Sequence, residues 1–206
     1  MTLAIAALVE AAGTLRGSSR PVALAPWSRI TLVEHLVEVV RPSTPEVVVV
    51  LGADAEAVLG AVELDGVTLV IDPEWREGAA SRVRVGLDTL LRESAADAVV
   101  VVDAGHPQVD AGVVATLVRA HAARKVRLGV DPRAADATVP KYRYVRAGPV
   151  VVGRELWPWL MNLEGETTVI QALQSHPDWV SEVWIDRLAP ATVLTTADME
   201  AAAPRH

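Results

Sequence analysis

The chain has 206 residues, no cysteine and a formal net charge of −7 at pH 7. The absence of cysteine excludes disulfide bonds, thiolate nucleophiles and cysteine metal sites. The sequence has no block of Lys and Arg, so nucleic acid is not expected as a main partner, because neutralising its phosphates requires clustered cations. No apolar run approaches the ~18 residues of a membrane span. We therefore expect a soluble, cytoplasmic protein with no membrane partner.

Apolar, strand-like runs alternate with helical patterns over the first 130 residues. Strands are expected at 3–9, 46–51, 67–71, 99–102 and 126–130, and helices at 28–40, 53–64, 78–92 and 110–124. Ser28 is a possible N-cap of the first helix. The four valines at 99–102 indicate a strand buried on both faces. The alternation predicts an α/β fold, a doubly wound, mostly parallel sheet with right-handed crossovers.

The pattern changes after Asp131. Residues 131–140 are rich in Pro, Asp and Ala and indicate a loop or the base of an extension. Residues 141–152 contain two β-rich pieces around a Gly-Pro turn, which indicates a short antiparallel arm. Short helices are expected at 154–160 and 166–174, a strand at 180–185 and a helix at 197–202. We expect a single domain over residues 1–206 with a β-arm insertion at about 136–153.

A first candidate site follows the first strand, in residues 10–20. Small residues and glycines after a strand let backbone N–H groups approach phosphate oxygens closely. Arg16 and Arg20 are suited to neutralising a triphosphate. The segment fits neither the P-loop nor the Rossmann glycine pattern. An ordinary loop with solvated arginines is the alternative.

Two further candidates lie at a helix start and at a strand end. Small residues before Ser81 leave room for a base or ribose, whereas simple helix capping is the alternative. Asp103 follows the four valines, at the edge where open sheets bind ligands. Its carboxylate is suited to Mg²⁺ or to a substrate hydroxyl, and capping of the local turn is the alternative. His106 flanks the same turn.

Several segments together resemble the nucleotidyltransferase superfamily, above all the 2-C-methyl-D-erythritol 4-phosphate cytidylyltransferases. DAGHP at 103–107 is similar to the family's D-A-x-R-P, RVRVGL at 82–87 to S-V-x-x-G-L, DATVPK at 136–141 to D-T-[IV]-K, RELW at 154–157 to R-x-x-L-W, and LTTADM at 194–199 to I-T-T-P-E-D-L. Residues 51–58 and 72–81 resemble the molybdenum-cofactor cytidylyl- and guanylyltransferases.

The resemblance implies a Rossmann-like nucleotide-diphospho-sugar transferase fold, a homodimer and a Mg²⁺-dependent enzyme of isoprenoid biosynthesis. In the implied reaction, a sugar or polyol phosphate attacks the α-phosphorus of CTP, and pyrophosphate leaves. The resemblance assigns catalysis to Arg16 and Arg20, metal binding to Asp103, nucleotide binding to Ala11, Ala12, Gly13, Thr14, Gly17, Ala80 and Ser81, and substrate binding to His106, Thr138, Lys141 and Arg154.

The chain departs from the family motifs mainly at cationic positions. His106 stands where the D-A-x-R-P arginine is expected, and the first loop is shorter and lacks the second glycine. The lysine of the family's P-K-Q segment has no clear match. A catalytically inactive relative that binds nucleotide or a protein partner therefore remains an alternative. A molybdenum-cofactor transferase acting on a pterin phosphate is a second one.

Overall fold

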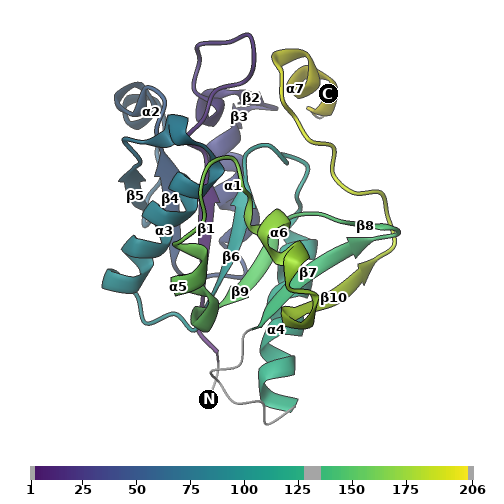
Figure 1. Cartoon of the computed structure of the whole chain (residues 1–206). Coiled ribbons are helices and arrows are strands. Elements are labelled where there is room, and N and C mark those ends of the chain that lie inside the picture. Colours follow the sequence, from purple (N-terminus) through teal and green to yellow (C-terminus); the bar gives the residue numbers. More distant parts are fainter. Residues whose placement is uncertain (1–2, 128–135, 204–206) are drawn as a thin grey trace.

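A mixed sheet forms the centre of the molecule (Figure 1). The computed structural model describes residues 3–127 and 136–203, and within them eight strands form this sheet, in the order β10-β7-β9-β6-β1-β4-β5 with β8 beside β7. The strands are β1 (Ile5–Glu10), β4 (Val47–Leu51), β5 (Thr68–Ile71), β6 (Ala98–Asp103), β7 (Ala137–Tyr142), β8 (Val145–Arg146), β9 (Val150–Gly153) and β10 (Val180–Ile185).

Most neighbouring strands of this sheet are parallel. β1 pairs in parallel with both β4 and β6, and β4 with β5. β9 runs antiparallel between β6 and β7, whereas β10 is parallel to β7. Every residue of β1 and β4 is buried, as expected for parallel strands covered on both faces. The expected α/β fold with a mostly parallel sheet is confirmed.

Helices cover both faces of the sheet (Figure 1). Alternate residues of β1 point to opposite sides, so Ala7 belongs to one apolar cluster and Leu8 to the other. The first cluster includes residues of α1 (Leu32–Val40), α2 (Ala55–Ala61), α4 (Ala111–Arg127) and α7 (Thr196–Ala202), and the second includes residues of α3 (Ala79–Glu93), α5 (Trp157–Leu160) and α6 (Val169–Ala172). None of the helices in the described residues is long and apolar enough to cross a membrane.

The first helix begins later than expected, and Ser28 is not its N-cap. The N-cap is Thr31, whose hydroxyl accepts from the N–H of Glu34, while the Glu34 carboxylate accepts from the N–H of Thr31 in a capping box. Ser28 lies instead in the two-residue turn between β2 (Pro26–Trp27) and β3 (Ile30–Thr31). Its φ of 59° lies in the left-handed region that such tight hairpins use.

Two expectations around residue 130 are wrong where the structure describes them. Residues 126 and 127 end α4 rather than beginning a strand, because extending an existing helix adds one hydrogen bond for each residue fixed. Residues 128–135 of the expected strand and loop lie outside the described residues. Residues 137–140 form the first part of β7, not a loop, because β9 and β10 pair with this segment from both sides. The other expected elements lie within a few residues of their observed positions.

The segment 136–153 contributes β7, β8 and β9. β7 and β9 lie inside the main sheet, and the hairpin between β7 and β8 projects at one corner, at the right of Figure 1. Tyr144 in its turn is 93% exposed, and Trp184 near the end of the adjacent β10 is 69% exposed. This corner therefore presents large aromatic side chains to solvent.

The contact between α3 and β1 predicts a contrast between two Gly→Ala substitutions. A Cβ at Gly86 of α3 would overlap the side chain of Leu8, whereas a Cβ at Gly60 of α2 has no other group within 4 Å. We expect Gly86→Ala to lower the free energy of unfolding by about 1–3 kcal/mol through overpacking. Gly60→Ala should raise it by up to about 1 kcal/mol through helix propensity. Urea unfolding measures both, and an equal effect of the two changes would contradict the described packing.

Candidate active site

Two acidic residues lie side by side at the carboxyl edge of the sheet. Glu10 is the last residue of β1 and Asp103 the last of β6, and the two are register partners in this parallel pair. Partner residues of adjacent parallel strands point to the same face of the sheet. Open α/β sheets bind their ligands at this edge.

A cavity of about 980 Å³ opens at these two carboxylates, and we call it the main cavity. Its volume is at the upper end of the range of about 300–1,000 Å³ that is typical of small-molecule sites. Its walls come from segments far apart in the chain: 13–16, 75–82, 103–106, 145–148, 166–171 and 189–194. Four of the described arginines line it: Arg16, Arg76, Arg82 and Arg146. The main cavity thus combines acidic groups at the sheet edge with cations on its walls.

A second, smaller cavity of about 50 Å³ shares the same acidic residues, and we call it the side cavity. Its lining consists of Glu10, Asp103 and His106 together with Val101, Val109 and residues 148–150 and 168–170. The space next to the two carboxylates is therefore partly enclosed by apolar residues of β9 and α6.

Glu10 is the most perturbed acid of the site. Its side chain is buried, with only 6% of the residue exposed, and Oε1 has no hydrogen-bond partner among the described residues. Burial and then the nearby charge of Asp103 raise the pKa of Glu10 to about 8, while Arg82 acts in the opposite direction. Sequence reasoning missed Glu10 as a site residue. Its signal was the one used for Asp103, an acid that ends an apolar strand.

The two carboxylate oxygens of Asp103 have different surroundings. Oδ1 accepts from the N–H of Gly105 at 2.8 Å, so the expected capping of the turn is present. Oδ2 lies 3.9 Å from Nδ1 of His106, whose Nε2 is 3.2 Å from the hydroxyl of Thr192. The Asp103 side chain is 33% exposed. One of its oxygens thus remains available to a ligand.

The loop after β1 places only part of its expected residues at the main cavity. Gly13, Thr14 and Arg16 line it, and the N–H of Arg16 donates to the C-terminal segment at the carbonyl of residue 194. Gly17 and Arg20 are exposed and do not line it. Gly17 has a φ of 78°, so this position favours glycine for its backbone conformation.

Ala11, Ala12, Ala80 and Ser81 are buried behind the cavity wall rather than lining it. The N–H of Ala53 donates to the carbonyl of Ala12 at 2.7 Å, which fixes the loop against β4.

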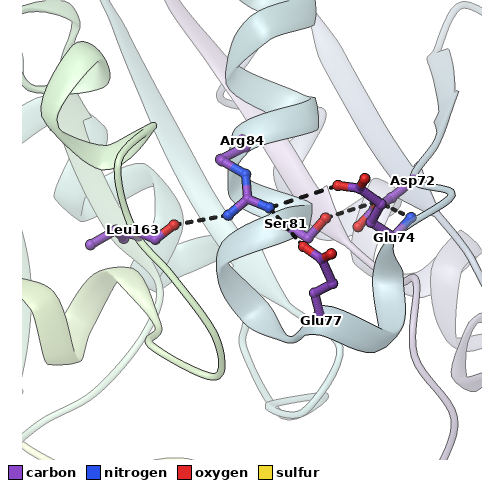
Figure 2. A network of polar contacts seen from close by, with 6 residues as sticks. All are labelled: Asp72, Glu74, Glu77, Ser81, Arg84 and Leu163. Atoms are coloured by element: carbon purple, nitrogen blue, oxygen red, sulfur yellow. Dashed lines mark hydrogen bonds and ion pairs between the residues drawn. The ribbon is translucent and has the colours of Figure 1, made fainter.

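Ser81 belongs to a polar network at the start of α3 (Figure 2). Its hydroxyl donates to Oδ1 of Asp72 at 2.9 Å, and the N–H of Glu74 donates to the same oxygen. In this structure Ser81 therefore fixes the segment 72–81 rather than facing a ligand.

Arg84 extends the network to Leu163, just before the cavity-lining residues 166–171. It donates to the carbonyl of Leu163 at 2.8 Å and pairs with Glu77 at 3.2 Å (Figure 2). The N–H of Ala80 also donates to the carbonyl of Gly165. These bonds tie the 163–171 segment to α3. Arg82, the residue after Ser81, is the charged residue of α3 that lines the cavity, and sequence reasoning had given it no role.

Within one chain, Thr138 and Lys141 do not reach either cavity. The hydroxyl of Thr138 is buried and lies 3.0 Å from Nδ1 of His121 on α4. The ammonium group of Lys141 pairs with Glu182 of β10 at 2.7 Å. Both side chains are held by contacts between β7 and its neighbours.

Arg154 lies at the opposite edge of the sheet from Asp103. It follows β9, whose last residue pairs with Ala98 at the start of β6. Its guanidinium donates to the carbonyls of Ser94 and Ala96 at 3.1 and 2.8 Å. Arg154 therefore stabilises the connection between α3 and β6 and is not near the cavity of its own chain.

The fold and this edge of the sheet define an α/β domain of the nucleotidyltransferase class. Residues 7–180 match the model of the MobA-like NTP transferase domain. The chain belongs to this family, and the superfamily resemblance inferred from its motifs is confirmed. No curated protein matches the sequence significantly.

Solved structures of the same fold support this assignment. The chain is 26% identical to a homologue of Mycobacterium tuberculosis Rv0371c from Mycobacterium sp. strain JC1, with a TM-score of 0.79 and coverage of 96% of this chain and 93% of that one. Rv0371c of M. tuberculosis H37Rv, solved as a complex with manganese, has 26% identity, a TM-score of 0.76 and 98% coverage of both chains. A 4-diphosphocytidyl-2C-methyl-D-erythritol synthase from Anaerococcus prevotii shares the fold at 16% identity, with a TM-score of 0.69 and coverage of 97% and 94%.

The raised pKa of Glu10 predicts a pH dependence of stability. The pKa of Glu10 is 4.5 in the unfolded chain and about 8 in the folded protein. Between pH 4.5 and about pH 8, Glu10 therefore keeps a proton in the folded protein that it has lost in the unfolded chain. The stability from this proton is complete below pH 4.5 and is lost as pH rises toward 8, by up to about 1.4 kcal/mol per pH unit. We expect urea unfolding in the presence of a chelator to show this decline in the wild type but not in Glu10→Gln. Parallel pH profiles for the two proteins would contradict the assignment.

Proposed function

We propose that the protein is a metal-dependent nucleotidyltransferase that joins a nucleoside monophosphate unit to a small phosphorylated acceptor. The observation that carries this proposal is the convergence of Glu10, Asp103 and four arginines on one large cavity at the carboxyl edge of the sheet. Membership of the MobA-like NTP transferase family supports a nucleoside triphosphate as one substrate.

In the proposed reaction, an oxygen of the acceptor phosphate attacks the α-phosphorus of the nucleoside triphosphate. The bond between that phosphorus and the bridging oxygen to the β-phosphate breaks, and pyrophosphate leaves with the electron pair. No covalent enzyme intermediate is required. Catalysis consists of positioning the reactants in line and neutralising the negative charge that they bring together.

The side chains of the main cavity have separate roles in this proposal. Arg16 and Arg82 are placed on the walls to neutralise phosphate oxygens, and guanidinium groups do this through paired donors. Gly13 and Thr14 offer backbone close to the same space. His106, beside Asp103, is placed to contact the acceptor.

The oxygens at the sheet edge suit a divalent metal ion. Oδ2 of Asp103 belongs to a partly exposed side chain and lies 3.9 Å from Nδ1 of His106, and the buried Oε1 of Glu10 has no hydrogen-bond partner within the described residues. Carboxylate oxygens are the donors that Mg²⁺ and Mn²⁺ prefer. When bound, such an ion supplies positive charge to the triphosphate and to the leaving pyrophosphate. The manganese complex of a relative at 26% identity supports metal dependence.

The motif resemblance favours CTP as the nucleotide and a sugar or polyol phosphate as the acceptor, which would place the enzyme in isoprenoid biosynthesis with Mg²⁺ as its metal. A pterin phosphate as acceptor and an inactive, nucleotide-binding protein are the competing outcomes. A screen of pyrophosphate release with each nucleoside triphosphate, Mg²⁺ and both acceptor classes separates them. If no combination of nucleoside triphosphate and acceptor gives pyrophosphate release, the proposed enzyme is overturned.

Substitutions in the main cavity should lower the rate of the transfer that this screen detects. We expect Arg16→Gln to reduce kcat/KM by at least about tenfold, since a charge-assisted contact to phosphate contributes roughly 1.5–3 kcal/mol. Asp103→Asn should cost at least about tenfold as well, because it removes the charge of a carboxylate that would bind the metal ion. Asp88→Asn and Arg119→Gln are matched controls, because Asp88 is half-exposed on α3 and Arg119 is exposed on α4, and neither lines the cavity. Comparing Arg20→Gln with Arg16→Gln tests whether both arginines assigned from the motifs act. Equal loss in the controls would argue against the site.

A homodimer is part of the same proposal. The corner formed by the β7–β8 hairpin and β10 exposes Tyr144, Trp184 and Leu188, which are 93%, 69% and 74% exposed. A second copy that covers this corner would bring Lys141, whose ammonium group lies 5.2 Å from the Trp184 ring centroid, to the interface. Thr138 and Arg154 remain buried or bonded within their own chain.

Sedimentation analysis tests the dimer. We expect Trp184→Glu to shift the protein toward the monomer, because a charge would replace buried aromatic surface at the interface. Leu59→Glu is the matched control, since Leu59 is also exposed, at 43%, but lies on α2. A wild-type protein that is monomeric at all concentrations would contradict this part of the proposal.

A further inference from the structure

We propose that Glu10 and Asp103 together hold a divalent cation before any nucleotide binds, with Glu10 as the second carboxylate ligand. This inference rests on the proposed function only in that the cation would serve the same transfer. It assigns to Glu10 a role that no motif of the sequence indicates.

The first support is the register of β1 and β6. The two acids are partners at the last position of adjacent parallel strands, so the sheet itself brings their side chains together on one face. Both residues line the main cavity and the side cavity. A cation between them would therefore be reachable from the space that the substrates occupy.

The second support is the state of the individual oxygens. Oε1 of Glu10 is buried and has no hydrogen-bond partner within residues 3–127 and 136–203, which is rare for a buried acceptor. In Asp103, which lines both cavities, Oδ1 accepts from the N–H of Gly105, whereas Oδ2 lies 3.9 Å from Nδ1 of His106, beyond hydrogen-bond distance. Each acid thus offers one oxygen that the protein does not use.

The third support is the local charge. Two ionised carboxylates in register at the ends of adjacent strands would repel each other, and Arg82 is a cation that lines the same cavity. A divalent cation would displace the proton of Glu10, neutralise the two carboxylates and bind their unused oxygens. No group of three or more acidic or His side chains suited to a metal exists among the described residues. Two carboxylates with water and phosphate completing the shell is the usual arrangement for Mg²⁺.

The fourth support is space. The side cavity has a volume of about 50 Å³. A single water needs roughly 10–15 Å³ on this measure, so the side cavity has room for a few ligand waters beside the acids. Its other walls come from residues 148–150 and 168–170, which are mainly apolar. They would shield the cation from bulk solvent on that side.

The test is a titration of the purified, nucleotide-free full chain with Mn²⁺ alone. Electron paramagnetic resonance measures the free and bound Mn²⁺ at each step. The wild type should show one saturable site in which Mg²⁺ competes. Glu10→Gln and Asp103→Asn should each weaken Mn²⁺ binding by at least about tenfold, since even outer-shell changes at metal sites cost that much. Glu166→Gln is the matched control, because Glu166 is an exposed acid that lines the main cavity but not the side cavity.

Thermal unfolding gives a second readout on the same proteins. Mn²⁺ should raise the Tm of the wild type and of Glu166→Gln, and it should raise the Tm of Glu10→Gln much less. If Glu10→Gln does not fold, Glu10→Asp replaces it. Its carboxylate is set back by one methylene, so weaker Mn²⁺ binding is expected.

Two results would overturn the inference: wild-type affinity in the Glu10 variant, or no saturable Mn²⁺ site in the wild type at millimolar concentrations. Pyrophosphate release distinguishes this failure from failure of the proposed function. A wild type that binds Mn²⁺ but transfers no nucleotide removes the function and keeps the cation site. If the wild type transfers nucleotide but the Glu10 variant binds Mn²⁺ as tightly as the wild type, the proposed function stands and Glu10 is not a cation ligand.

Discussion

The parallel pairing of β1 with β6 is the constraint on which the site depends. Six consecutive residue pairs fix this register, from Ile5 with Ala98 to Glu10 with Asp103. Because side chains alternate along a strand, a slip of one residue would send the acids to opposite faces. The buried valines and alanines of both strands oppose such a slip, since it would exchange the contents of the two apolar clusters. Core packing thus determines where the two charges lie.

A second layer of the structure turns this acidic edge into a cavity. The hydrogen bond from Ser81 to Asp72 and the bonds of Arg84 hold the start of α3 against the 163–171 segment. On the opposite side, the N–H of Arg16 bonds to the C-terminal segment at residue 194. These contacts are between segments remote in sequence. They place arginines on the walls while the acids remain at the sheet edge, which is a charge distribution suited to a metal-bound triphosphate.

The sequence predicted the elements best where a local pattern and the tertiary environment agree. The valine runs of β4 and β6 are long enough to indicate buried parallel strands by themselves. Prediction failed for residues 137–140, because the partner that makes them a strand, β10, comes about forty residues later in the chain. It failed also for Ser28, since the capping residue was selected by the hairpin before α1. Asp103 could be found as a site candidate because it ends an obvious strand, whereas Arg82 could not, because its direction depends on how α3 packs.

The sequence by itself determined the fold class, the family and the presence of an acid at the end of β6, because these depend on hydrophobic periodicity and short motifs. Only the tertiary structure decided which residues share one space. It brought Glu10 to Asp103, added Arg76, Arg82 and Arg146 to the cavity, and held Arg154 at the opposite edge. The reason is physical: strand order and helix packing bring together residues that are far apart along the chain. Burial then changes the charge state of a group such as Glu10 in a way that no local pattern records.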